Sequence, residues 1–242
     1  MREKICLVIP CYNEAKRLDF GKIAAAPENI RFVFVDDGSS DNTASLLAAH
    51  AGPRVTFCRL PANVGKAEAV RQGMLFARNH DFGRDADWLG YWDADGSPAF
   101  SEAPCAAAYA ELFYPRAKAV FASRIWRLGS DIVRSPMRHL ASRVFITAVS
   151  LLLNCRIYDT QCGAKLFRRD VLSVFDEPFI SRWIFDLEVY FRLKNLGAQA
   201  VEYPVMAWSE EAGSKLGVCS QCVPVLRDLF KIRRRYLRGA AK

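Results

Sequence analysis

Apolar segments too short for helices recur along the first half of the chain, and this pattern limits the possible folds more than any other feature. Five near-continuous apolar runs are expected as strands, at residues 5–10, 31–35, 55–60, 88–92 and 119–122. Helical patterns separate these runs, at residues 41–50, 64–79 and 101–114. Strands that are apolar throughout are typical of a parallel sheet with helices on both faces. The alternation therefore predicts an open, mostly parallel α/β sheet.

The chain length and the second half of the sequence indicate one domain with a helical extension. A chain of 242 residues can build one domain with a substantial core. Two further helical patterns, at residues 136–155 and 224–237, combine Leu, Val and Phe with arginines. We predict a sheet-based domain over residues 1–216 and a basic amphipathic helix over residues 217–242.

Basic residues are concentrated in two segments of the chain, whose net charge is +8. Residues 116–143 and residues 227–242 each hold seven Lys and Arg against one acid. Such clusters favour a phosphate group or an anionic surface as the partner, and we expect no nucleic acid. The apolar helices in or beside these segments either pack on the sheet or lie in a membrane interface. With no apolar run of 18 residues and no signal peptide, we expect a cytoplasmic protein attached peripherally to a membrane.

Polar clusters follow three of the predicted strands. The first strand runs into Tyr12, the second into Asp36 and Asp37, and the fourth into the pair Asp93 and Asp95. The carboxyl ends of parallel strands lie along one edge of a sheet, so these side chains should meet in one crevice. Two carboxylates so close repel each other unless a positive partner compensates them. A divalent cation with oxygen ligands would meet that need.

In this order, four segments resemble family 2 glycosyltransferases with the GT-A fold: VIPCYNE (8–14), VDDGSSDNT (35–43), NVGKAEAVRQG (63–73) and DADG (93–96). The resemblance implies an enzyme that binds a nucleotide sugar, with Tyr12 near the base and Asp37 on uracil. It also implies that Asp93 and Asp95 bind Mg2+ or Mn2+, which bridges to the nucleotide diphosphate. The nucleotide-binding residues that it implies are Pro10, Tyr12, Glu14, Asp37, Lys66 and Asp93.

The second half of the chain resembles a narrower group within that family. DTQCGAKLF (159–167), ISRWIFDLEVYF (180–191), EYPVMAW (202–208) and GSKL (213–216) look like dolichyl-phosphate β-glucosyltransferases. That resemblance implies inverting transfer of glucose from UDP-glucose to a polyprenyl monophosphate. Ala164 stands where those enzymes usually carry an aromatic residue. The membrane anchor common at the N-terminus of eukaryotic members is absent here, which indicates peripheral attachment or a soluble acceptor.

The acceptor decides what the active site has to supply. A phosphate monoester loses its second proton near pH 6, so at neutral pH it is already an anionic nucleophile. It needs positive groups to hold it rather than a general base, and arginine suits bidentate phosphate recognition. The predicted acceptor-phosphate residues are Arg124, Arg134, Ser135, Arg138 and Lys215, and we expect Arg124 and Asp95 to act in catalysis.

Asp186 has two possible roles. Its helix, FDLEVYFRLKNLG, resembles the one that carries the general base in family members with hydroxyl acceptors. With a phosphate acceptor, Asp186 would instead orient the acceptor or an arginine. The alternatives that stay open are another nucleotide sugar such as GDP-mannose, and a hydroxyl acceptor with Asp186 as base. A more distant alternative is a nucleotidyltransferase. Such enzymes carry a glycine-rich loop after the first strand, and the segment VIPCYNEAKR lacks those glycines. The other distant alternative is a non-catalytic membrane-binding module.

Overall fold

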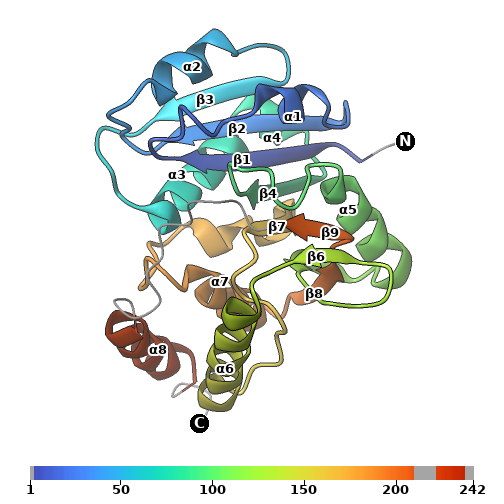
Figure 1. Cartoon of the computed structure of the whole chain (residues 1–242), viewed down its shortest axis with the longest axis vertical. Helices are drawn as coiled ribbons and strands as arrows, with labels where there is room; N and C mark the ends of the chain where they lie inside the picture. The colour runs from blue at the N-terminus through green and yellow to red at the C-terminus, as the bar shows by residue number, and fades with distance from the viewer. Residues whose placement is uncertain (1–2, 210–221, 238–242) are drawn as a thin grey trace.

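The computed structural model describes residues 3–209 and 222–237, and seven of the described strands form one central sheet (Figure 1). The strand order is β3-β2-β1-β4-β7-β5-β8, and all neighbours are parallel except β7, which is antiparallel to both β4 and β5. The bounds are β1 Ile5–Cys11, β2 Ile30–Asp36, β3 Val55–Arg59, β4 Trp88–Trp92, β5 Ala117–Ser123, β7 Ala164–Arg168 and β8 Gln199–Pro204. The predicted mostly parallel α/β sheet is confirmed. The five predicted strands are β1 to β5, and β7 and β8 are the strands of this sheet that the sequence did not indicate.

Helices cover both faces of the sheet because the strands are apolar on both sides. Along β1, Ile5, Leu7 and Ile9 belong to one buried cluster, whereas Cys6 and Val8 belong to another. The first cluster is closed by α1 (Phe20–Ala24), α2 (Thr43–Ala49) and α5 (Glu102–Phe113). The second is closed by α3 (Lys66–Asn79), α4 (Asp81–Arg84), the 3-10 helix η1 (Arg169–Phe175) and α7 (Phe185–Asn195).

The second half adds a helical layer beside α7. Helices α6 (Pro136–Leu153) and α8 (Cys222–Tyr236) pack with α7 around a third buried cluster that includes Val149, Leu187 and Ile232. Figure 1 shows α6 and α8 together at the end of the molecule away from β1, β2 and β3. Strand β6 (Asp131–Val133) precedes α6 and forms a short parallel pair with β9 (Ala207–Ser209), which follows β8.

The predicted C-terminal helix is present as α8, but it shares a core with α6 and α7. Its Tyr236 hydroxyl donates a 2.9 Å hydrogen bond to Glu188 on α7. The predicted boundary between residues 216 and 217 falls outside the described residues, so that division of the chain stays a prediction. Within the described ranges no helix has the length and apolar character needed to cross a membrane.

The contact between β4 and β7 offers a test of the fold. A methyl group at Gly90 would overlap the carbonyl oxygen of Lys165 on β7. We expect Gly90→Ala to lower the free energy of unfolding by about 1–3 kcal/mol, the usual effect of overpacking a well-filled core. Gly52→Ala is the matched control, because no atom lies within 4 Å of the added methyl group there. Urea unfolding of both variants measures the difference, and equal stability would contradict this account of the β4–β7 contact.

Candidate active site

The loops after β1 and β2 are held together by side chains that bond across the sheet edge. The Asn13 backbone N–H donates to Ser39 Oγ at 3.0 Å, and Asn13 Oδ1 accepts from the Ser40 backbone N–H at 2.9 Å. The backbone N–H of Glu14 donates to Thr43 Oγ1 at 2.9 Å. Tyr12 lies on this braced loop with 41% of its surface exposed, and Pro10 is half-buried at the end of β1. An exposed aromatic ring on a rigid loop can stack on a flat ligand.

Asp37, directly after β2, holds the turn that leads into α3. It is 2% exposed, and it accepts hydrogen bonds from the backbone N–H groups of Val64 (2.8 Å) and Gly65 (2.9 Å). Gly65 has φ +88°, a left-handed conformation that glycine adopts without strain. Burial raises the pKa of Asp37, against the two N–H groups and Arg182, which lower it. The turn that Asp37 fixes is the one that places Lys66.

Asp93 and Asp95 follow β4 at the same edge. Lys66 Nζ lies 2.5 Å from Asp93 Oδ1, and Asp95 Oδ1 accepts the Ser97 backbone N–H at 2.9 Å. Burial and then the charge of Asp93 raise the pKa of Asp95. Although desolvation opposes it, the attraction of Asp93 and of Asp186 raises the pKa of Lys66. The repulsion between two neighbouring carboxylates is thus offset in part by one lysine.

Gly163, in the DTQCGAK segment, packs against the Asp93 carboxylate. A side chain at this position would overlap both carboxylate oxygens of Asp93. The segment just before β7 is therefore packed directly against the Asp93 side chain. This contact explains why glycine stands in the middle of that motif.

The Asp93–Asp95 pair fits a hard divalent cation. Among the described residues no group of three or more His, Cys, Asp or Glu side chains could hold a metal ion. The two carboxylates nevertheless offer the oxygen donors that Mg2+ and Mn2+ prefer. The pKa of Asp95, raised in part by Asp93, shows a repulsion that a cation between them would relieve. Such an ion would need further oxygen ligands from phosphate or water, which is the usual arrangement for Mg2+.

Arg124, directly after β5, is held by Asp159. Its Nε and Nη2 donate to the two oxygens of Asp159 at 2.6 and 2.8 Å, and its backbone N–H donates at 3.1 Å. Although burial opposes ionisation, Arg124 holds the pKa of Asp159 well below its usual range. The backbone N–H of Asp159 is itself bound by Glu202 at 3.0 Å. Arg124 is thus fixed by an ion pair that the sequence did not reveal.

The other predicted acceptor residues lie near Trp208 and α6. The guanidinium groups of Arg124 and Arg134 lie 5.0 and 5.7 Å from the centre of the Trp208 ring. Burial, and then the charge of Arg124, lower the pKa of Arg134, so the two cations are close enough to repel. Ser135 directly precedes α6, and Arg138 belongs to its first turn. Lys215 lies outside the described residues, and its role stays a prediction.

Asp186, at the start of α7, is 6% exposed and has two partners that the sequence reasoning missed. Its Oδ1 accepts from the Tyr91 hydroxyl at 2.5 Å and lies 2.6 Å from Lys165 Nζ. Tyr91, on β4, lies two residues before Asp93, and Lys165, on β7, lies two residues after Gly163. Residues two apart on an extended chain point to the same side, so the spacing of Tyr91 from Asp93 and of Lys165 from Gly163 is the signal in the sequence that could have indicated these two partners.

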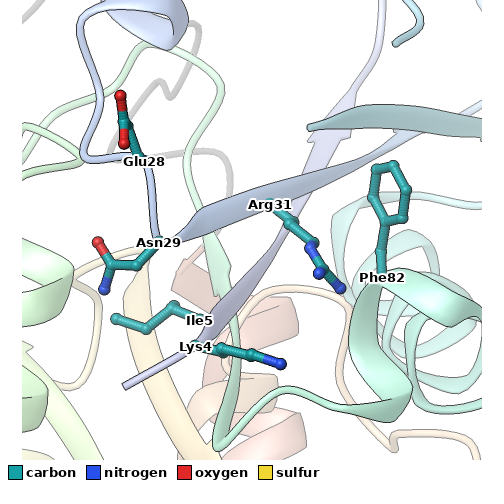
Figure 2. A pocket seen from close by; sticks show the side chains of 6 residues that line it. All are labelled: Lys4, Ile5, Glu28, Asn29, Arg31 and Phe82. Carbon is teal, nitrogen blue, oxygen red and sulfur yellow. The ribbon is translucent and has the colours of Figure 1, made fainter. Parts of the chain in front are cut away.

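A hollow at the other edge of the sheet is not part of this arrangement. It lies beside the start of β1 and β2, as Figure 2 shows, and its lining residues are Lys4, Ile5, Glu28, Asn29, Arg31 and Phe82. Ligands of open α/β sheets bind at the carboxyl ends of strands, and this hollow is at the amino ends. The site is therefore assigned to the edge that carries Asp37, Asp93 and Asp95.

Sequence comparisons relate the chain to known glycosyltransferases. The profile of Glycosyl transferase family 2 matches residues 6–175. The dolichyl-phosphate β-glucosyltransferase of Dictyostelium discoideum is 30% identical over 98% of this chain and 76% of that protein. The Drosophila melanogaster protein of the same name is 33% identical over 98% of this chain and 76% of its own. The human protein of that name is 29% identical, with 98% and 77% covered.

Solved structures agree on the fold. The UDP complex of glucosyl-3-phosphoglycerate synthase from Mycobacterium tuberculosis has a TM-score of 0.63 at 17% identity, over 95% of this chain and 80% of that one. A mannosyltransferase from Pyrobaculum calidifontis, in complex with GDP-Man and Mn2+, has a TM-score of 0.66 at 19% identity, over 98% and 65%.

The mostly parallel sheet that the chain shares with these structures is of the GT-A type. The chain belongs to glycosyl transferase family 2. The resemblance inferred from the motifs is thereby confirmed, including the narrower similarity to dolichyl-phosphate β-glucosyltransferases.

The contact between Gly163 and Asp93 allows a direct test of the role of Asp93 in cation binding. We expect Gly163→Ala to turn the Asp93 carboxylate away from its position and to weaken Mn2+ binding by about tenfold or more, since one of two carboxylate ligands is displaced. The fold should persist, because the displaced atoms are the end of one side chain. Titration calorimetry with Mn2+ and UDP measures the binding, with Gly52→Ala as control. Unaltered affinity in a folded variant would refute the assignment of Asp93 to the cation site.

Proposed function

We propose that the protein transfers glucose from UDP-glucose to a polyprenyl monophosphate with inversion at the anomeric carbon. The observation that carries this proposal is the similarity to dolichyl-phosphate β-glucosyltransferases, which extends over 98% of the chain and so includes both halves. The first half of the chain supplies the strand ends with the proposed nucleotide-binding residues, and the second half supplies Arg124 and Arg134. Relatives from three different organisms, each about 30% identical to this chain, carry the same enzyme name, which supports the same class of substrates here.

The donor occupies the edge formed by β1, β2 and β4. Tyr12 contacts the base and Asp37 binds the uracil, while Pro10 and Glu14 shape the loop that holds them. Lys66 and Asp93 lie side by side and face the diphosphate. When bound at Asp93 and Asp95, Mg2+ or Mn2+ supplies Lewis-acid neutralisation of the diphosphate. Lys66 adds a second positive charge at the same place, because its Nζ is already 2.5 Å from Asp93.

The acceptor phosphate is held by the cationic group around Trp208. A phosphate oxygen attacks the anomeric carbon, the bond from that carbon to the UDP oxygen breaks, and UDP leaves with the electron pair. The bound phosphate is a dianion at neutral pH, so no proton has to be removed. Arg124 is already oriented by Asp159, and Arg134, Ser135, Arg138 and Lys215 complete the proposed set. A fixed arginine loses little entropy when it binds phosphate.

A lipid acceptor requires contact with a membrane, and we place that contact at α6 and α8. The outer surface of α6 exposes Met137, Leu140, Val144 and Leu151, and that of α8 exposes Leu226 and Phe230. Arginines lie between the apolar residues of α8, at positions 227 and 233–235. Apolar and basic side chains on one helix favour binding in an anionic interface. We propose peripheral attachment at the cytoplasmic face.

A screen of donors against acceptors tests the function directly. We expect UDP release with UDP-glucose and a short polyprenyl phosphate in Mg2+ or Mn2+, and none with the dephosphorylated polyprenol. Asp95→Ala should lower kcat by about a hundredfold or more, because a Lewis acid contributes several kcal/mol. Asp131→Ala, which removes an exposed carboxylate on β6, is the control. Equal turnover with the alcohol, or a preference for GDP-mannose, would overturn the proposed substrates.

The membrane contact has its own test. We expect the double variant Leu226→Ser and Phe230→Ser to bind vesicles with anionic lipids at least about tenfold more weakly, since two large apolar side chains leave the interface. The control is Leu112→Ser with Phe113→Ser, which removes two exposed apolar residues from α5. Vesicle co-sedimentation measures both. An equal loss in the two double variants would contradict a specific role of α8.

A further inference from the structure

Lys165 is a fully buried lysine that the proposed reaction does not use. It belongs to β7 and has no exposed surface. Its Nζ lies 2.6 Å from Asp186 Oδ1 and donates to the carbonyl oxygen of Cys162 at 2.6 Å. The Nζ also lies 5.4 and 5.1 Å from the ring centres of Tyr91 and Phe121. All these partners hold the ammonium group in one position.

Stability alone does not account for this ion pair. Removing two charges from water costs more than the pair commonly regains, and apolar residues of similar size are often equally stable. A buried lysine beside one carboxylate is therefore not expected to stabilise the core more than an apolar residue of similar size would. Its location suggests a reason. Asp186 is bonded to Tyr91, two residues before Asp93, and Lys165 lies two residues after Gly163, which packs against the Asp93 carboxylate.

The pair also decides what Asp186 can do. Oδ1 already lies 2.6 Å from Lys165 Nζ and accepts from the Tyr91 hydroxyl at 2.5 Å. A general base must have an oxygen free to take up the proton of the acceptor hydroxyl, and two donor groups already occupy Oδ1 of Asp186. An uncompensated carboxylate at this place would also repel an anionic acceptor.

We infer that Lys165 is a specificity-determining positioning residue, whose ammonium group cancels the charge of Asp186 so that the site accepts an anionic nucleophile rather than a hydroxyl group. This inference rests on the proposed function. With a phosphate dianion, the bond to the anomeric carbon forms while UDP leaves, and no proton moves. With a hydroxyl acceptor, a proton would have to pass to Asp186, whose Oδ1 is already in contact with Lys165 and Tyr91.

Two variants separate this role from a structural one. Lys165→Met leaves Asp186 uncompensated, and we expect its KM for polyprenyl phosphate to rise about tenfold or more, while KM for UDP-glucose changes far less. Adding Asp186→Asn removes the second charge, and the double variant should recover a KM within about threefold of the wild-type value. Lys118→Met is the matched control, because it breaks a solvent-exposed pair with Asp170 at the neighbouring strand.

The measurements are steady-state kinetics with both substrates varied, and urea unfolding to confirm that each variant folds. If Lys165→Met does not fold, the neutral double variant carries the test by itself. The inference expects it to keep at least about a tenth of the wild-type kcat, whereas loss of a general base would lower kcat by about 10²–10⁴. That larger loss, or a folded double variant whose KM stays as high as that of Lys165→Met, would overturn the inference.

The proposed function fails by a different result. If the wild-type enzyme does not transfer glucose to polyprenyl phosphate, the substrates are wrong whatever the variants do. If the wild-type enzyme is active but charge removal at position 186 gives no rescue, the function stands and the role of Lys165 is wrong.

Discussion

Charge compensation at one edge of the sheet is the constraint on which the site depends. Three of the carboxylates there are each paired with a cation: Asp93 with Lys66, Asp159 with Arg124 and Asp186 with Lys165. Isolated ionised groups are costly to bury, so the fold has to supply these partners before it can hold any ligand. The pairing at Asp93 is the most exposed of the three, as suits a place where a ligand enters.

Strand β7 and the segment before it contribute to two of these three pairs. The antiparallel insertion between β4 and β5 brings Gly163 against Asp93 and Lys165 against Asp186. The segment before it carries Asp159, which holds Arg124. The motif DTQCGAK thus makes three separate contacts, Asp159 with Arg124, Gly163 with Asp93 and Lys165 with Asp186, which connect the proposed donor edge to the proposed acceptor arginines.

Much of the fold and part of the site could be predicted from the sequence. The parallel strands and their helices have period and apolar content that do not depend on distant residues. Asp37, Asp93 and Asp95 follow from their place at strand ends. The partners of the buried groups could not be predicted in this way: Lys165 is 21 residues from Asp186 in the chain, and Arg124 is 35 residues from Asp159. Local patterns carry no information about such pairings.

The sequence by itself determined the α/β class, the resemblance to family 2 and the carboxylate pair after β4. These depend on local periodicity and on residue types at strand ends. The tertiary structure alone decided the place of β7, the capture of Arg124 by Asp159 and the neutralisation of Asp186. The physical reason is that strand insertion and buried ion pairs are settled by packing and desolvation across the whole chain, where each charge takes the partner that the fold brings within reach.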